Sequence, residues 1–194
     1  MEKPYHHFSY EALEKATKIE VLGHDAVIEG GIGNNVERYL YFRDRGYTGL
    51  YIGMDLDRKS TVLPAGLIRE YGDCLEPSRL HSLRSQYHLS NPIFVTNSVL
   101  YLLIQGYEGH MENVVDALTG VFKKQLHIRP AGNFPLTKST VYYPETTASR
   151  EFNNFMKFVE ESRKRGWKED VVGKNIVLLK WEPQTLLEGW LRRD

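Results

Sequence analysis

The sequence has only one cysteine, Cys74, among its 194 residues. A single thiol cannot form an internal disulfide, and the first ten residues, MEKPYHHFSY, lack the apolar core of a secretory signal. No apolar run approaches the roughly 20 residues that a helix needs to span a bilayer. We therefore expect a protein of the reducing cytoplasm without a membrane-spanning segment.

The sequence also lacks an excess of either charge. Lys plus Arg and Asp plus Glu both number 25, so no overall basic field draws the molecule onto phosphate backbones, and nucleic acid is not an expected partner. A local basic patch is left open. The hydrophobic content of 41% is enough for one buried core, and no repeat, linker or low-complexity tract divides the chain. The sequence predicts a single domain over 1–194, with an N-terminal helix within 1–20, a core over 21–182 and a C-terminal segment over 183–194.

Apolar periodicity predicts a strand, a glycine turn, a helix and a second strand over residues 25–55. The continuous apolar run within 25–29 is typical of a strand that is covered on both faces. From Asn34 the pattern becomes helical, with apolar side chains at i, i+3 and i+4 and a stop at Gly46. Residues 49–55, GLYIGMD, form the second strand, which completes a βαβ unit.

The alternation continues to the end of the chain. We expect a weak third strand over 67–71, a strong fourth over 92–103 and a fifth over 125–130. The two most amphipathic helices cover 111–122 and 152–159, and each lays one apolar stripe on a sheet. Two short strands follow within 167–181, joined by a hairpin-type turn around Gly173, Lys174 and Asn175.

The order of these elements and the turn EGGIGNN after the first strand resemble class I S-adenosylmethionine-dependent methyltransferases over roughly residues 20–182. The resemblance implies a doubly wound, seven-stranded Rossmann-like α/β sheet, mostly parallel with a reversed last strand. In that family an acidic residue precedes a G-x-G-x-G turn, where glycine lets the cofactor lie against the backbone. The corresponding cofactor-binding residues here are Glu29, Gly30, Gly31 and Gly33, with Asn35 in place of the third glycine.

Three further positions match the family's pattern. The acid that ends the second strand and holds the cofactor's ribose is Asp55, and Asp57 is an alternative two residues on. The acid after the third strand, which contacts the adenine, corresponds to Asp73. Asn97, at the end of the fourth strand, would face the cofactor and the methyl-transfer site. Each position also has a purely structural interpretation, because such polar groups satisfy helix N-termini, turns and strand ends.

His110 and Tyr142 are the remaining candidates for catalysis. His110 precedes the helix over 111–122 and could reach the cleft as a general base, although a surface histidine at a helix start is the alternative. Tyr142 and Tyr143 lie in a long loop over 134–147, which we expect to cover the acceptor unless the two tyrosines only pack. No metal-ligand spacing is present; His81 and His88 lie seven apart, which suits a solvated helix face better than a metal site.

These features together predict methyl transfer from S-adenosylmethionine to a small-molecule acceptor. No Asn-Pro-Pro-Tyr-type segment follows the fourth strand, which argues against enzymes that methylate nucleic-acid bases. Two alternatives remain: a methyltransferase-fold partner subunit without catalysis, and a nicotinamide-cofactor protein, although Val36 stands where the dinucleotide fingerprint needs its third glycine. A homo-oligomer, or docking through the C-terminal PQTLLEGWLRRD, is left open.

Overall fold

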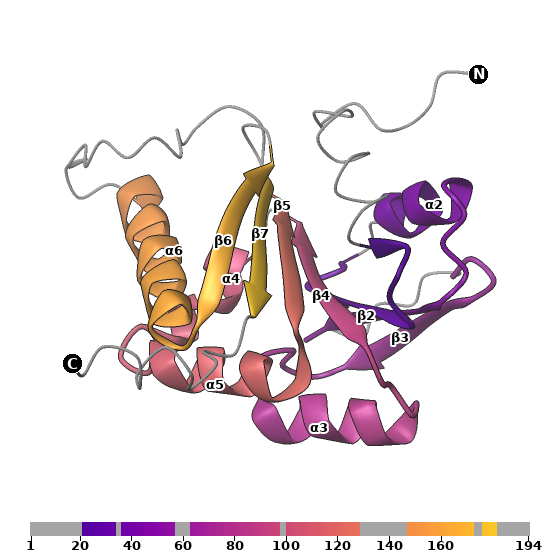
Figure 1. Ribbon diagram of the computed structural model, residues 1–194, viewed down its shortest axis with the longest axis horizontal. Coiled ribbons are helices and arrows are strands. Elements are labelled where there is room, and N and C mark those ends of the chain that lie inside the picture. Colours follow the sequence, from indigo (N-terminus) through magenta and orange to yellow (C-terminus); the bar gives the residue numbers. More distant parts are fainter. Residues whose placement is uncertain are drawn as a thin grey trace, which may run out of the picture.

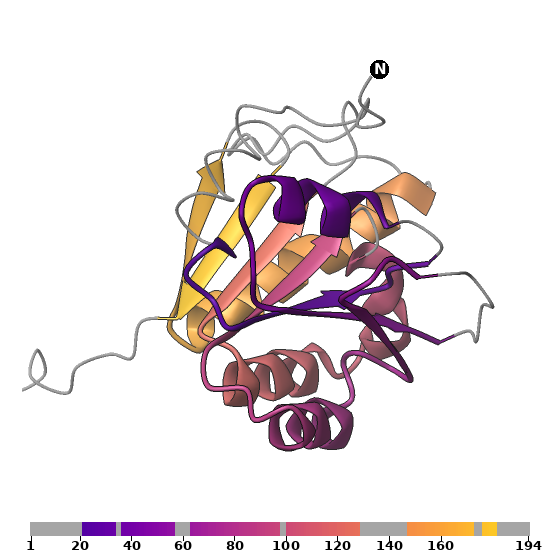
Figure 2. The same ribbon diagram turned by 90° about the vertical axis from the view of Figure 1, so that its right-hand side faces the viewer.

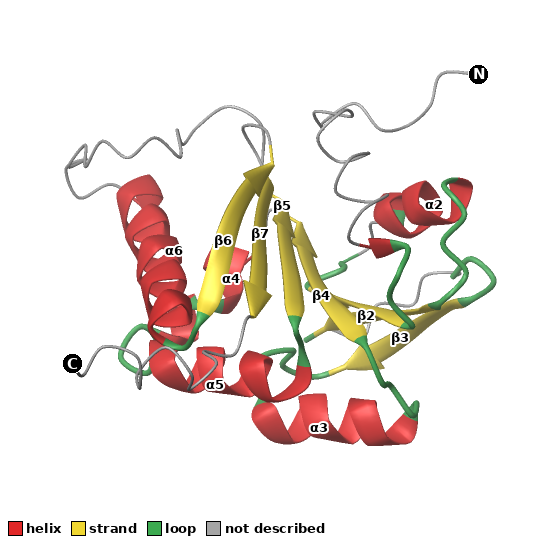
Figure 3. Ribbon diagram, in the orientation of Figure 1, coloured by secondary structure: helices red, strands yellow, loops and turns green. Residues whose placement is uncertain are grey.

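The computed structural model describes residues 21–33, 36–56, 63–97, 100–128, 147–172 and 176–181. Both helices and strands occur along these ranges (Figures 1 and 3). The expected N-terminal helix and the C-terminal segment lie outside them, as does the loop expected over 134–147 except for Thr147, which begins α6. The elements are β1 Ala26–Gly30, α2 Glu37–Asp44, β2 Leu50–Asp55, β3 Leu67–Tyr71, α3 Pro77–Gln86, β4 Pro92–Asn97, α4 Leu100–Leu103, the 3-10 turn η2 Gln105–Tyr107, α5 Met111–Val121, β5 Lys124–Ile128, α6 Thr147–Lys164, β6 Trp167–Val172 and β7 Ile176–Trp181.

The described strands form one sheet in the order β3-β2-β1-β4-β5-β7-β6. The first five in chain order run parallel to one another, and β7 is antiparallel to both of its neighbours, β5 and β6. The predicted α/β fold with a mostly parallel, Rossmann-like sheet is confirmed. Strand order reverses between β1 and β4, and ligands of open α/β sheets bind at the carboxyl ends of the strands beside such a switch point.

Helices cover both faces of the sheet (Figure 2). In β1, Ala26 and Ile28 belong to the core shared with α3, α5 and α6, while Val27 belongs to the core shared with α2. Every residue of β1 is buried. Burial on both faces explains why this central strand is a continuous apolar run instead of an alternating one.

The end of the fourth strand differs from the prediction. The apolar run predicted a strand over 92–103, but β4 ends at Asn97 and residues 100–103 form α4. Thr96 pairs with Gly30, the last residue of β1, so β4 ends close to where its partner ends. Leu100 and Ile104 are buried and continue the apolar pattern as helix packing. An apolar run alone does not separate a buried strand from a buried helix.

His81 and His88, which would share a face if one helix covered both, are separated by the helix end. His81 is exposed on α3, but α3 ends at Gln86 and His88 has a left-handed φ of 53°. Among the residues that the structure describes, no three His, Cys, Asp or Glu side chains gather as a metal site. Within the same ranges, no helix combines the length and the apolarity needed to cross a membrane.

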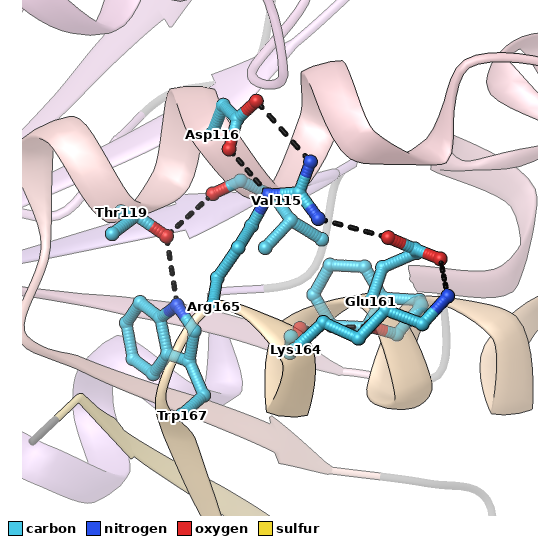
Figure 4. A network of polar contacts seen from close by, with 9 residues as sticks. Val115, Asp116, Thr119, Glu161, Lys164, Arg165 and Trp167 are labelled. Atoms are coloured by element: carbon cyan, nitrogen blue, oxygen red, sulfur yellow. Dashed lines mark hydrogen bonds and ion pairs between the residues drawn. The ribbon is translucent and has the colours of Figure 1, made fainter. Parts of the chain in front are cut away.

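Polar contacts fix the end of α6 to α5 (Figure 4). Arg165 pairs with Asp116 of α5 and also with Glu161 of α6, where Nη1 and Oε2 are 2.8 Å apart. The Trp167 indole nitrogen donates to Thr119 Oγ1 at 2.7 Å. Because α5 is followed directly by β5, its last turns lie at the amino edge of the parallel strands. This network therefore stabilises the edge opposite to the glycine turn.

A polar cluster lies within the apolar layer between the sheet and α6. His127 is 1% exposed, and its ring packs edge-on against Phe158 at a centroid distance of 5.5 Å. Its Nδ1 lies 2.8 Å from Thr96 Oγ1 and its Nε2 lies 3.1 Å from Gln125 Oε1. The amide oxygen only accepts, so Nε2 carries the proton and Nδ1 accepts from the threonine hydroxyl. Burial lowers the pKa of His127 to about 3.

The buried imidazole should make the protein less stable as the pH falls. Between the unfolded pKa of about 6.5 and the folded value, only the unfolded chain binds the proton, so the free energy of unfolding decreases by about 1.4 kcal/mol per pH unit. The His127→Gln variant should lose this component of the pH dependence. Urea unfolding of parent and variant at pH 7, 6 and 5 measures it, and equal slopes for the two proteins would show that His127 does not contribute.

Candidate functional site

The turn after β1 is fixed by hydrogen bonds to β2. The backbone amides of Gly31 and Ile32 both donate to the carbonyl oxygen of Met54, at 2.9 and 3.1 Å. Gly31 and Gly33 have φ angles of 68° and 57°, in the left-handed region that glycine adopts without steric cost. The two glycines at i and i+2 therefore let the chain turn sharply at the carboxyl end of the central strand.

Gly33 is held from two neighbouring strands. Its amide donates to Asp55 Oδ2 at 2.7 Å, and its carbonyl oxygen accepts from Arg69 Nη2 of β3, also at 2.7 Å. Among the described residues other than its chain neighbours, the nearest atom to a Cβ added to Gly33 would be Asp55 Oδ2, 4.0 Å away. No described side chain therefore fills the position of a Gly33 side chain, which lies beside a carboxylate.

Gly30 is a glycine for a different reason. It is buried, and a Cβ atom there would lie 2.8 Å from Cys74 Sγ and 3.0 Å from Phe94 Cζ. Because Cys74 and Phe94 pack this close to the backbone of residue 30, only glycine fits there, whether or not a ligand is bound. Burial and then the Asp73 charge raise the pKa of Cys74, so the thiol stays protonated and is not a nucleophile.

The Glu29 carboxylate is engaged within the protein. Glu29 is fully buried; it forms an ion pair with Arg38 of α2, and Tyr51 of β2 donates to its Oε2 at 2.5 Å. Burial and then the Glu29 charge raise the pKa of Tyr51 well above its usual value, which keeps the hydroxyl a donor. Glu29 therefore links β1, α2 and β2 beneath the glycine turn, and its contact with a cofactor stays a prediction.

Asp73 lies two residues beyond β3 and also has partners within the chain. Its Oδ1 accepts from the Leu75 amide at 2.8 Å and its Oδ2 from the Tyr107 hydroxyl at 2.6 Å. Burial and then this carboxylate raise the pKa of Tyr107. The bond joins the end of β3 to η2, which follows α4 in the chain. Tyr107 is consequently part of the candidate site.

The structure brings four of the predicted residues, Gly31, Gly33, Asp55 and Asp73, to the carboxyl edge of β1, β2 and β3. Asn97 ends β4 at the same edge, in register with Ile128 of β5. His110 is exposed at the N-cap of α5, and its amide donates to the Tyr107 carbonyl at 2.8 Å, which places its backbone next to η2. Outside the described residues lie Asn35, Asp57, Tyr142 and Tyr143.

Three residues at this edge were not predicted from the sequence. Leu56 directly follows Asp55 and is 68% exposed. Arg69 is a charged residue within the short strand LIREY, and this charge inside a strand was the only feature of the sequence that could have indicated a role for it. The Tyr107 side chain meets Asp73 across 34 residues of sequence, and no local pattern indicates such a contact.

Comparison with known proteins adds to this geometry. Neither a family model nor a curated protein sequence matches the chain. Among solved structures, an O-methyltransferase family protein from Burkholderia thailandensis superposes with a TM-score of 0.53 and 11% identity, over 91% of this chain and 57% of that one. A SAM-dependent methyltransferase from Anabaena variabilis gives a TM-score of 0.50 and 10% identity, over 90% and 86% of the two chains. The chain has the fold of class I S-adenosylmethionine-dependent methyltransferases.

Other solved structures with this fold differ in the ligands or substrates that their names give. MycE, a methyltransferase from the mycinamycin biosynthetic pathway, was solved with Mg, SAH and mycinamycin VI; it gives a TM-score of 0.50 and 13% identity over 89% of this chain. The chain spans only 50% of MycE. A putative ribosomal RNA methyltransferase from Plasmodium falciparum gives a TM-score of 0.50 and 9% identity, over 89% of this chain and 94% of its own. The shared fold therefore does not select the acceptor.

Proposed function

We propose that the carboxyl edge of β1, β2 and β3 binds S-adenosylmethionine and that the protein transfers the methyl group to a small-molecule acceptor. The observation that carries the proposal is the position of Gly33 next to the Asp55 carboxylate, at the switch point of the sheet, where no described side chain would touch a Cβ on Gly33 except Asp55. An uncharged backbone surface beside a carboxylate suits a nucleoside whose ribose hydroxyls donate hydrogen bonds.

The residues at this edge fit the cofactor by their chemistry. Asp55 would accept hydrogen bonds from the ribose hydroxyls, and the exposed side chain of Leu56 supplies an apolar surface for the adenine ring. Asp73 would accept from the adenine amino group with the lone pairs that Leu75 and Tyr107 leave available, since a carboxylate has about four acceptor sites. The positive sulfonium and ammonium groups of the cofactor also suit an edge with two carboxylates.

Positioning is the main contribution that the chain would make to the reaction. When bound, the cofactor supplies a methyl group that is already electrophilic, and alignment with the acceptor lowers the barrier further. Asn97, at the end of β4, would orient the acceptor near the methyl group. His110 would take the acceptor's proton, and Tyr142 would help to cover the acceptor from its loop.

A small molecule is the acceptor that the chain itself favours. Acidic and basic residues balance at 25 each, so no overall positive field would hold a nucleic acid. Asn97 is followed by Ser98, Val99 and Leu100, which do not form the Asn-Pro-Pro-Tyr pattern. A cytoplasmic location and a homo-oligomer stay predictions from the sequence.

A second candidate function is a methyltransferase-fold subunit that does not catalyse methyl transfer. It is supported by the internal engagement of two acidic side chains, Glu29 with Arg38 and Tyr51, and Asp73 with Tyr107. Mass spectrometry of ligand retained by the purified protein separates the candidates. Adenosylhomocysteine, the product of methyl transfer, supports the enzyme, whereas adenosylmethionine alone also fits the non-catalytic subunit. A nicotinamide nucleotide contradicts both, and titration with adenosylhomocysteine decides whether the cofactor site exists if nothing is retained.

The Asp55→Ala variant should bind adenosylhomocysteine about 1.5 to 3 kcal/mol more weakly, the scale of charge-assisted hydrogen bonds. Calorimetric titration measures the difference. A matched control is Asp25→Ala, because Asp25 accepts from the Ser90 and Asn91 amides at the opposite end of β1. The control should lose stability and keep its affinity. If Asp55→Ala binds as tightly as the parent, Asp57 holds the ribose or the cofactor assignment is wrong.

A further inference from the structure

We infer that Arg69 is a positioning residue. It would hold the glycine turn in place while the cofactor's ribose hydroxyls engage the Asp55 carboxylate. Arg69 would not contact the cofactor; it acts through the Gly33 carbonyl, to which Nη2 donates at 2.7 Å. The inference rests on the proposed function and adds to it a residue from β3, the edge strand on this side of the sheet.

The packing at Gly53 explains how the turn reaches Arg69. Gly53 lies in register with Glu29 on one side and with Arg69 on the other. A Cβ atom on Gly53 would be only 2.4 Å from Ile32 Cδ1, so the side chain of Ile32 occupies the space above this strand position. The turn therefore folds back over β2, and Gly33, which follows Ile32, lies between Asp55 and Arg69.

The two bonds to Gly33 differ in what a ligand does to them. Asp55 Oδ2 accepts from the Gly33 amide, and the ribose hydroxyls would compete for the same carboxylate. Arg69 donates to the carbonyl on the other side of Gly33, and the ribose hydroxyls that would donate to Asp55 cannot donate to a guanidinium, which has no acceptor. Since its donor is charged, the Arg69 bond is also stronger than a bond between neutral groups. It would hold the turn in place when the ligand takes Asp55.

The test compares three variants of the full chain. Arg69→Met keeps the length of the side chain without a donor, and Arg69→Lys keeps the charge and a donor. Arg79→Met is the matched control, because Arg79 of α3 pairs with Glu70 on the opposite face of the same strand. Adenosylhomocysteine affinity is measured by calorimetry at a temperature at which every variant is folded, and amide hydrogen exchange at Gly33 is followed without ligand.

Arg69→Met should weaken binding by about tenfold to a hundredfold and accelerate exchange of the Gly33 amide. Arg69→Lys should recover most of the affinity, and Arg79→Met should keep parental affinity and exchange even if its melting temperature falls. Parental affinity in Arg69→Met, or an equal loss in Arg79→Met, would overturn the inference and leave the proposed function standing. If the parent itself binds no adenosylhomocysteine, the proposed function fails and the cofactor role of Arg69 with it, whereas Gly33 exchange still reports whether Arg69 holds the turn.

Discussion

The Arg38→Met variant is expected to lose about 3 to 5 kcal/mol of the free energy of unfolding. Glu29 is fully buried and Arg38 is 3% exposed, so water cannot replace the lost cation. Tyr51 would remain as a donor to Glu29 Oε2, but a neutral hydroxyl does not balance a buried carboxylate. The contacts weakened would be those between β1, α2 and β2, which carry Glu29, Arg38 and Tyr51. Urea unfolding at pH 7 measures it.

Two controls show whether the buried charge is the cause. The double variant Arg38→Met and Glu29→Gln removes both charges and should recover much of the loss. Arg43→Met removes another arginine of α2, whose Nη1 donates to the Tyr47 carbonyl at 2.8 Å in a half-buried position, and should cost about 1 kcal/mol. A loss below 1 kcal/mol in Arg38→Met would contradict the importance of this ion pair.

The Gly33→Val variant should lose cofactor binding altogether while its sheet remains folded. The two methyl groups of valine would occupy the open space beside Asp55 that we assign to the ligand. A β-branched side chain also disfavours the φ of 57°, which adds a strain of about 1 to 2 kcal/mol. Calorimetric titration and thermal melting of the same preparation separate the two effects.

Gly46 offers a matched control for the strain. It has a φ of 89°, and a Cβ atom added there would meet no heavy atom of the described residues within 4 Å, its chain neighbours aside. Gly46 follows α2 and is distant from the carboxyl edge of the strands, so Gly46→Val should lower the melting temperature and keep the affinity. Unchanged affinity in a folded Gly33→Val protein would remove the glycine turn from the site, and with it the main support for the methyltransferase proposal.

The elements best predicted from the sequence are those whose pattern of burial stays the same along their length. β1 is buried on both faces and reads as a continuous apolar run, and α5 places Met111, Val114 and Leu118 on one buried face. α3 was not predicted, because between Pro77 and Gln86 only Leu80 and Leu83 are buried. The predicted end of the fourth strand at residue 103 was wrong, because β4 ends at Asn97, close to where its partner β1 ends.

The candidate site was predictable to the extent that it follows strand ends. Parallel strands bring their carboxyl ends to one edge, so the positions of Asp55 and Asp73 follow from the order of the elements. The partners of the acidic groups did not follow, since Arg38 reaches Glu29 only after α2 has packed on the sheet. Arg69 was missed for the same reason: its bond to Gly33 joins residues 36 apart in the sequence.

The contact between Gly30 and Cys74 allows alkylation of the native thiol to report on local opening at the end of β1. Cys74 is the only thiol in the sequence, is 2% exposed and packs against Gly30, the last residue of β1 before the turn. An alkylating reagent can reach the sulfur only when this packing opens transiently. The rate at which the natural sequence is alkylated therefore measures how often the structure opens next to the glycine turn. A ligand bound to the turn should lower this rate, and the measurement needs no introduced cysteine.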